Sequence, residues 1–261
     1  MPSGDLADRR VLVVGASLGI GLAAARAIAA EGARVAFAAR RVDVLREVVE
    51  EVGAGCVALA CDVRDPASCA SVVEECVAAF GGLDALIYSP GITLYNPIEE
   101  MDAEAWQTTL ETNVVGATLV TRAAISHLKE SRGKAVFFSS IAVDDQPPRY
   151  GMAPYVVNKV ALETLVRAWQ GEHHDVGFTT IAMGDTISGK VVESDIEVLQ
   201  DLVQRWTSKG YMYGRMMDAE SVAAQIVSVL RSPETVRRLA ITPNYSEEDR
   251  VMEITLAERE R

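Results

Sequence analysis

The sequence predicts an α/β fold with one doubly wound parallel sheet of about seven strands, covered by helices on both faces. From Arg10 onward, short apolar runs rich in β-branched residues alternate with longer segments of helical periodicity. Many of the runs are apolar on both faces, as the strands of a covered parallel sheet are. No repeat or low-complexity linker interrupts the series, so we expect a single domain.

Each element follows from a local pattern. The expected strands are the apolar runs at residues 11–14, 34–38, 57–60, 85–88, 135–139, 178–182 and 239–242. The expected helices are the periodic segments at residues 20–31, 42–52, 67–80, 103–128, 153–173, 192–206 and 219–230. Asp65 followed by Pro66 is typical of a helix start.

The domain should span residues 10–243, after a short N-terminal extension at residues 1–9 and before a charged tail at residues 244–261. Two irregular segments, residues 144–152 and 188–215, break the rhythm and are candidates for a functional role. Neither a secretory signal nor an apolar run of membrane-spanning length is visible, so we expect a cytoplasmic protein.

Charge and composition narrow the possible partners. The formal net charge is −12, which disfavours binding to nucleic acid or to an anionic membrane. The four cysteines, Cys56, Cys61, Cys69 and Cys76, have neither zinc spacing nor a disulfide framework, so we expect free and mostly buried thiols. The three histidines do not converge, and no metal is expected. The charge and composition are compatible with a small-molecule substrate.

A glycine cluster follows the first expected strand and precedes an Ala-rich helix. Glycines permit a tight turn and close backbone approach to a pyrophosphate, and the positive end of a helix attracts its charge. The candidate binding residues here are Gly15, Ser17, Leu18, Gly19, Ile20 and Gly21. A closely packed turn without a ligand is the alternative.

The Gly-x-x-x-Gly-x-Gly spacing of this turn resembles that of the short-chain dehydrogenase/reductase family, whose domain is a Rossmann-type NAD(P)-binding fold. The resemblance covers roughly residues 10–243. The family's acidic ribose-binding residue is replaced by Ala39, with Arg40 and Arg41 after it, and a guanidinium suits a ribose 2′-phosphate. The resemblance therefore implies NADP(H), although both arginines could simply solvate the next helix. The other residues that it implies at the cofactor are Asp62, Val63, Ser89, Gly91, Gly184 and Thr186.

Tyr155 and Lys159 stand four residues apart in a helical segment, which brings both side chains to one face. With Asn113 and Ser140 upstream, they follow the order of the family's catalytic set. The resemblance implies that Tyr155 exchanges a proton with a carbonyl or alcohol oxygen and that Ser140 hydrogen-bonds this oxygen. Lys159 would hold the nicotinamide ribose and favour the phenolate by its charge, while Asn113 would act through a local helix distortion and a water.

Some positions depart from the family pattern: Val14, the run Tyr88-Ser89-Pro90, Met183, and a long interval between Ser140 and Tyr155. The departures put cofactor affinity in doubt more than reaction type, with bulky Tyr88 expected near the adenosine side. We expect an NADP(H)-dependent carbonyl reductase or alcohol dehydrogenase. A cofactor-binding regulator or scaffold without turnover, and an NADP-dependent epimerase or dehydratase, are the alternatives.

Two further expectations concern assembly and substrate. The long apolar periodicity of the helices at residues 103–128 and 153–173, together with the resemblance, implies a homodimer or homotetramer. Residues 188–215 should form a lid over the substrate. Its aromatics Trp206, Tyr211 and Tyr213 suit an apolar or ring-bearing substrate, and its cations Arg205, Lys209 and Arg215 suit a carboxylate or phosphate.

Overall fold

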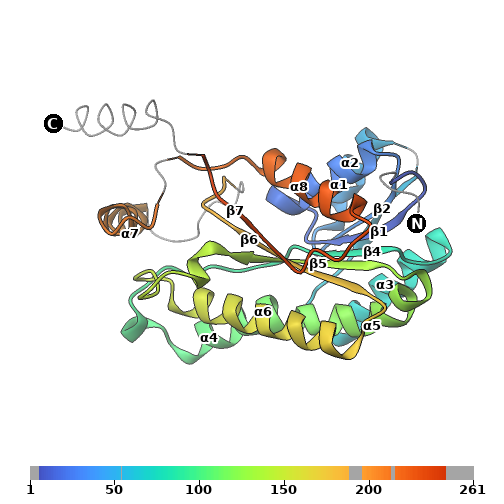
Figure 1. Ribbon diagram of the computed structural model, residues 1–261. Helices are drawn as coiled ribbons and strands as arrows, with labels where there is room; N and C mark the ends of the chain where they lie inside the picture. The colour runs from blue at the N-terminus through green and yellow to red at the C-terminus, as the bar shows by residue number, and fades with distance from the viewer. Residues whose placement is uncertain (1–5, 54, 188–195, 213–214, 245–261) are drawn as a thin grey trace.

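The structure is a computed structural model that describes residues 6–53, 55–187, 196–212 and 215–244. Seven parallel strands form one sheet in the order β3-β2-β1-β4-β5-β6-β7, which confirms the expected architecture (Figure 1). The strands are β1 Arg10–Val14, β2 Arg34–Ala39, β3 Cys56–Ala60, β4 Ala85–Tyr88, β5 Lys134–Ser140, β6 Gly177–Met183 and β7 Arg238–Ile241. The predicted tail lies almost wholly outside the described residues.

Helices cover both faces of the sheet, with α1, α2 and α8 on one side and α3 to α6 on the other (Figure 1). They are α1 Gly19–Ala30, α2 Val42–Val52, α3 Pro66–Phe80, α4 Ala103–Leu110, α5 Gly116–Ser131, α6 Ala153–Glu172, α7 Ile196–Ser208 and α8 Ala219–Arg231. Asp65 caps α3 as expected, since its carboxylate accepts a hydrogen bond from Ala67 N at 2.9 Å.

Alternation along the strands divides the core into two layers. In β1, Leu12 and Val14 pack with the helices on the α3 to α6 side, whereas Val11 and Val13 pack with α1, α2 and α8. A third apolar cluster, which includes Met152 and Trp206, lies where α7 meets the loop after β5. This third cluster stands apart from the sheet's two core layers and forms part of the site described below.

One expected helix is interrupted. The segment predicted as a single helix at residues 103–128 is α4, then a π-helical turn at Glu111–Val115, then α5. Tyr88 donates a hydrogen bond from its hydroxyl to Thr112 O at 2.6 Å, and this contact with β4 fixes a carbonyl of the widened turn. The distortion near Asn113 that the family resemblance implied is therefore present.

The strand order reverses between β1 and β4. The chain builds outward from β1 to β3, then returns to place β4 on the other side of β1. In a doubly wound sheet this reversal opens a crevice beyond the carboxyl ends of the two strands. The glycine turn after β1 and the segment after β4 both lie at this edge.

Candidate active site

The glycine turn allows a ligand to approach the backbone closely. Gly15 and Gly19 have φ angles of 83° and 59°, which favour glycine. A side chain on Gly21 would collide with the Gly15 carbonyl and lie 2.8 Å from Ser89 Oγ. Leu18 precedes α1 and makes no side-chain capping bond, so the helix start offers backbone N–H groups suited to a pyrophosphate. Ser17 and Ile20 lie in the same turn and at the helix start.

The ends of β2 and β3 present positive charge at the surface. Arg40 and Arg41 are exposed directly after the buried Ala39. Arg64 pairs with the Asp62 carboxylate at 3.0 Å, and this contact lowers the pKa of Asp62, with a smaller electrostatic contribution from Arg40. Arg40 and Arg64 thus both act on the Asp62 carboxylate at this edge.

The segment after β4 differs from the expectation at one residue. Tyr88 does not obstruct the adenosine side, because its side chain is 1% exposed and packs in the core beside Phe137. Val63 is likewise buried in that core. Ser89 faces the glycine turn, since its Oγ would contact a side chain on Gly21. Tyr88, which departs from the family pattern, therefore stabilises the core of the fold.

The predicted catalytic side chains converge beyond β5. Ser140 ends this strand, and its hydroxyl hydrogen-bonds Tyr155 on the first turn of α6. Lys159 lies one helical turn later, with Nζ 5.5 Å from the centroid of the Tyr155 ring. The same ammonium donates to Phe138 O at 2.6 Å, which holds Lys159 against β5.

Burial controls the acidity of Tyr155. Its pKa is raised to about 12, chiefly because burial disfavours the phenolate, while the hydrogen bond with Ser140 opposes this effect. The direction is opposite to the one expected from Lys159 alone. The hydroxyl therefore keeps its proton at neutral pH, as a general acid must.

Asn113 links the π-helical turn to the loop after β4. Its Oδ1 accepts from Ile92 N at 2.7 Å and its Nδ2 donates to Ile92 O at 2.9 Å. A side chain on Gly91 would lie 3.6 Å from both Asn113 Oδ1 and Lys159 Nζ. Glycine at this position therefore leaves room beside the Lys159 ammonium, and Asn113 fixes the loop that provides it.

The segment after β6 completes the edge. Gly184 N donates to Ile241 O at 2.8 Å, and the Thr186 hydroxyl donates to Gly184 O at 2.8 Å. Thr186 also forms a β-bridge with Met217. These contacts hold Gly184 and Thr186 at the edge where Ser140 lies, because Met183 pairs with Ser140 in the sheet.

Sequence reasoning missed a buried ionic cluster at Arg149, whose side chain is 2% exposed. Its Nε donates to Asp145 Oδ2 at 2.7 Å and its Nη1 to Asp185 Oδ1 at 2.8 Å. Its Nη2 donates to Tyr211 O at 2.7 Å. The Arg149 side chain therefore joins the loop after β5, the segment after β6 and the segment after α7. No hydrophobic periodicity marks these residues: Asp145, Arg149 and Tyr211 lie in the two irregular segments, and Asp185 lies in neither.

The predicted lid aromatics pack on that loop. Trp206 Nε1 donates to Tyr150 O at 2.9 Å, and Tyr211 donates from its hydroxyl to Pro147 O at 2.9 Å. Two of the cations expected to meet an anionic substrate have other partners, since Arg205 pairs with Asp201 and Arg215 donates to Asn244 O. Tyr213 and residues 188–195 lie outside the described residues.

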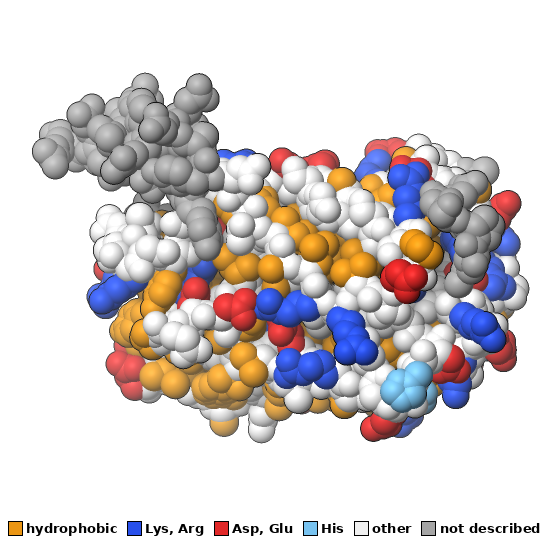
Figure 2. All heavy atoms as spheres, in the orientation of Figure 1, with side chains coloured by type: hydrophobic (Ala, Val, Ile, Leu, Met, Phe, Trp, Pro, Cys, Tyr) orange, Lys and Arg blue, Asp and Glu red, His pale blue; other side chains and the backbone are white. Residues whose placement is uncertain are grey.

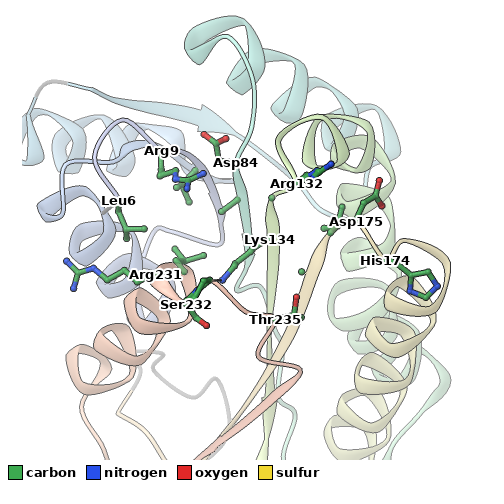
Figure 3. A pocket seen from close by; sticks show the side chains of 17 residues that line it. Leu6, Arg9, Asp84, Arg132, Lys134, His174, Asp175, Arg231, Ser232 and Thr235 are labelled. Carbon is green, nitrogen blue, oxygen red and sulfur yellow. Dashed lines mark hydrogen bonds between the residues drawn. The ribbon is translucent and has the colours of Figure 1, made fainter. Parts of the chain in front are cut away.

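A cavity of about 310 Å³ lies at the opposite, amino-terminal edge of the sheet (Figure 3). Lys134 reaches into it and donates from Nζ to the carbonyls of Val229, Ser232 and Glu234. The ammonium thus caps the carboxyl end of α8. We assign Lys134 and the cavity around it a structural role, because the Lys134 ammonium is already bound by backbone carbonyls.

Within the described ranges, no group of three or more His, Cys, Asp or Glu side chains could hold a metal ion. The four cysteines are free, and three of them are buried, as expected. No helix in the described part of the chain is both long and apolar enough to cross a membrane.

A glycine turn at the strand-order reversal, with Ser140, Tyr155 and Lys159 at the same edge, is the arrangement of a dinucleotide-binding domain that carries a candidate proton-transfer site. A family model described as short chain dehydrogenase matches residues 9–195. The chain belongs to the short-chain dehydrogenase family, whose members use NAD or NADP.

Individual relatives agree with this assignment. The chain is 34% identical to 11-beta-hydroxysteroid dehydrogenase 1A of Arabidopsis thaliana, over 77% of this chain and 60% of that protein. It is 33% identical to an uncharacterized oxidoreductase of Mycobacterium tuberculosis, over 66% of this chain and 53% of that protein. The chain thus covers less than two thirds of the length of these relatives.

Solved structures resemble the whole domain. A short-chain type dehydrogenase/reductase from Mycobacterium marinum superposes with a TM-score of 0.81 at 27% identity, covering 93% of this chain and 97% of that one. An alcohol dehydrogenase from the archaeon Thermococcus sibiricus, complexed with 5-hydroxy-NADP, superposes with a TM-score of 0.76 at 25% identity. That match covers 91% of this chain and 99% of the archaeal chain.

Proposed function

We propose that the chain is an NADP(H)-dependent carbonyl reductase or alcohol dehydrogenase in which Tyr155 is the general acid and base. The observation that carries the proposal is the contact between the Ser140 hydroxyl and Tyr155, with Lys159 one helical turn away. These groups lie at the edge that also holds the glycine turn. The residues present therefore fit both a dinucleotide and a reacting oxygen.

Bound NADPH would supply the hydride to the carbonyl carbon. Tyr155 donates its phenolic proton to the carbonyl oxygen, and the Ser140 hydroxyl donates a hydrogen bond to that oxygen as negative charge develops on it. Lys159 stabilises the resulting phenolate and holds the nicotinamide ribose hydroxyls. Alcohol oxidation reverses these steps, with the phenolate accepting the hydroxyl proton.

The glycine turn and the start of α1 are proposed to hold the pyrophosphate, and Arg40 with Arg41 the ribose 2′-phosphate. The exposure of both guanidinium groups beside the buried Ala39 supports this choice of NADP(H) over NAD(H). Asp62 and Val63 are proposed at the adenine, Ser89 and Gly91 along the cofactor, and Gly184 with Thr186 at the carboxamide.

Three wider features belong to the same proposal. The domain spans residues 10–243, and the segment at residues 188–215 acts as a lid that closes on substrate. The enzyme is a cytoplasmic homodimer or homotetramer that acts on small molecules and binds neither nucleic acid nor membrane. The formal charge of −12 supports the exclusion of anionic partners.

The test is turnover of a broad panel of aldehydes and ketones with NADPH, for the parent protein and for Tyr155→Phe. The substitution should lower kcat by roughly 10²- to 10⁴-fold and leave NADPH binding near the parent value, because it deletes the transferable proton and little volume. Tyr150→Phe is the control, since Tyr150 is 44% exposed and lies outside this group. Cofactor binding without turnover of any carbonyl would favour a regulator or scaffold, and near-parent turnover by Tyr155→Phe would place the acid elsewhere.

A further inference from the structure

Asp185 follows β6 and carries a buried carboxylate oxygen. Its Oδ1 is bound by Arg149 at 2.8 Å, whereas its Oδ2 is buried and has no hydrogen-bond partner among the described residues. Burying an acceptor without a partner is unfavourable. An unpaired oxygen on a side chain that is otherwise firmly held suggests that a ligand supplies the missing donor.

The position of Asp185 is fixed from two sides. Met183 pairs with Ser140 in the sheet, and Asp185 follows Met183 by two residues. Its backbone carbonyl accepts from Met217 N at 2.8 Å, and its carboxylate is held by Arg149, whose side chain is 2% exposed. Burial is the main reason why the pKa values of Tyr155 and Tyr95 are raised; the negative charge of Asp185 adds to this effect and the positive charge of Arg149 opposes it.

Apolar groups surround Tyr95 and Tyr155, the two phenols on which the Asp185 charge acts. Tyr95 and Tyr155 pack against the third apolar cluster, and the rings of Tyr95 and Trp206 lie 5.9 Å apart. The side chains packed around Tyr155 are therefore mostly apolar or aromatic, and Asp185 is an acceptor two residues after Met183, the strand partner of Ser140. Such surroundings suit an apolar substrate body that carries few polar groups.

The ionic cluster also selects by charge. One guanidinium, that of Arg149, is shared by the carboxylates of Asp145 and Asp185, which leaves one formal negative charge on this ionic cluster. A substrate carboxylate or phosphate would be repelled, whereas a hydroxyl or an ammonium would find an acceptor.

We propose that Asp185 is a specificity residue whose Oδ2 accepts a hydrogen bond from a hydroxyl or ammonium group on an otherwise apolar carbonyl substrate. Arg149 is the positioning residue that orients the carboxylate. The proposal rests on the reductase function above and names the substrate class that this site takes.

The first experiment compares cyclohexanone with 2-, 3- and 4-hydroxycyclohexanone, 4-aminocyclohexanone and 4-oxocyclohexanecarboxylate, each reduced with NADPH by the parent enzyme. At least one donor-bearing ketone should have a kcat/KM roughly 10- to 100-fold above that of cyclohexanone, because a hydrogen bond to a charged group adds about 1.5–3 kcal/mol. The carboxylate should react more slowly than cyclohexanone. The hydroxy and amino compounds distinguish the two donor sources.

The second experiment uses two variants that remove one charge each from the same cluster. Asp185→Asn should reduce the ratio of kcat/KM for the preferred donor-bearing ketone to that for cyclohexanone to about one. The reason is that the amide can place an N–H₂ donor where the carboxylate has its unpaired acceptor oxygen. Asp145→Asn is the matched control, because Asp145 also binds Arg149 and its side chain is 17% exposed against 20% for Asp185. This control should keep the parent ratio for the uncharged hydroxyketones, whereas the ratio for the aminoketone also responds to the lost charge. Thermal melting and NADPH titration accompany both variants.

Several outcomes would overturn the proposal. They are equal turnover of all ketones by the parent, an equal loss of preference in both variants, and a weakened NADPH affinity in Asp185→Asn with the preference kept, which would direct Oδ2 to the cofactor. The parent comparison decides if Asp185→Asn does not fold. Failure of the parent to reduce any carbonyl would reject the reductase function itself, whereas reduction without preference would reject only the role of Asp185.

Discussion

Burial of the Tyr155 phenol favours one direction of the proposed reaction at neutral pH. A pKa of about 12 keeps the hydroxyl protonated, which suits proton donation to a carbonyl. The reverse reaction needs the phenolate, whose population grows as the pH rises. The side chain thus makes the two directions respond differently to pH.

We therefore expect kcat/KM for alcohol oxidation with NADP⁺ to rise with pH and still to be rising at pH 10, the ordinary pKa of tyrosine. Carbonyl reduction should stay level over the same range, because the acid form persists below the raised pKa. Initial rates in both directions across a pH series measure this. A plateau in oxidation at neutral pH would instead show that Lys159 lowers the pKa during catalysis more than burial raises it.

Cofactor choice is also decided by single residues. Arg40→Ala should weaken NADPH binding by roughly 10- to 100-fold and leave NADH binding unchanged, since only the 2′-phosphate would lose a charged partner. Arg46→Ala is the control, because Arg46 is an exposed arginine of α2 that pairs with Asp43. Adding Ala39→Asp to Arg40→Ala should reverse the preference in fluorescence titrations. Equal affinity of the parent for both dinucleotides would contradict the assignment.

At the scale of elements, the π-helical turn between α4 and α5 depends on contacts that a local pattern does not contain. Apolar periodicity continues through residues 103–128, so sequence alone predicts one helix. The turn widens where Tyr88 and Asn113 bond to residues more than twenty positions away. Such distant hydrogen bonds override periodicity, and only the family resemblance pointed to a distortion here.

Asn113→Ala should destabilise this turn and the loop after β4 together. The variant leaves Ile92 N and O without their present partners, which costs about 1–3 kcal/mol in the free energy of unfolding. It should also lower kcat, because the loop beside Lys159 loses its anchor. Denaturant unfolding and steady-state kinetics measure both effects, with the exposed Gln107→Ala as control. An unchanged kcat at reduced stability would confine Asn113 to a structural role.

The strands were predictable because short apolar runs mark them, whereas Ser140, Tyr155 and Lys159 were predicted from a strand end, a four-residue helical spacing and the family resemblance. Predicted strand limits differ from the structure by one residue at most, as at Arg10 and Met183. Arg149 and Asp185 were not predictable in this way. Arg149 comes from an irregular segment and Asp185 from the residues just after β6, and their pairing depends on the tertiary approach of two loops 36 residues apart in the chain.

At the scale of the whole molecule, one surface remains apolar outside the site. Hydrophobic side chains gather at the lower left of Figure 2, over the part of the molecule that contains α4. Large exposed apolar residues on α4, α6 and the π-helical turn are Leu110, Val115, Val157 and Val160. An apolar surface of this kind is typical of an interface between copies.

We expect the double substitution Val157→Asp and Val160→Asp to convert the proposed oligomer to monomers, because both side chains are about half exposed, at 52% and 46%. Val44→Asp is the control, since Val44 lies on α2 and is 38% exposed. Light scattering at micromolar concentration gives the mass of each protein. A monomeric parent would exclude the oligomer, and an unchanged mass of the double variant would move the interface elsewhere.

Lys134 stabilises the fold at the amino-terminal edge of the sheet, whereas the proposed chemistry takes place at the carboxyl-terminal edge. Its ammonium holds three carbonyls at the end of α8, on the opposite edge from Tyr155. Lys134→Met should lower the free energy of unfolding by about 1–3 kcal/mol while leaving kcat/KM per folded molecule unchanged, as calorimetry and kinetics would show. A loss of turnover in proportion to the loss of stability would mean that the two edges are coupled. Heat tolerance can then be engineered at this edge independently of substrate choice, which is set at the other.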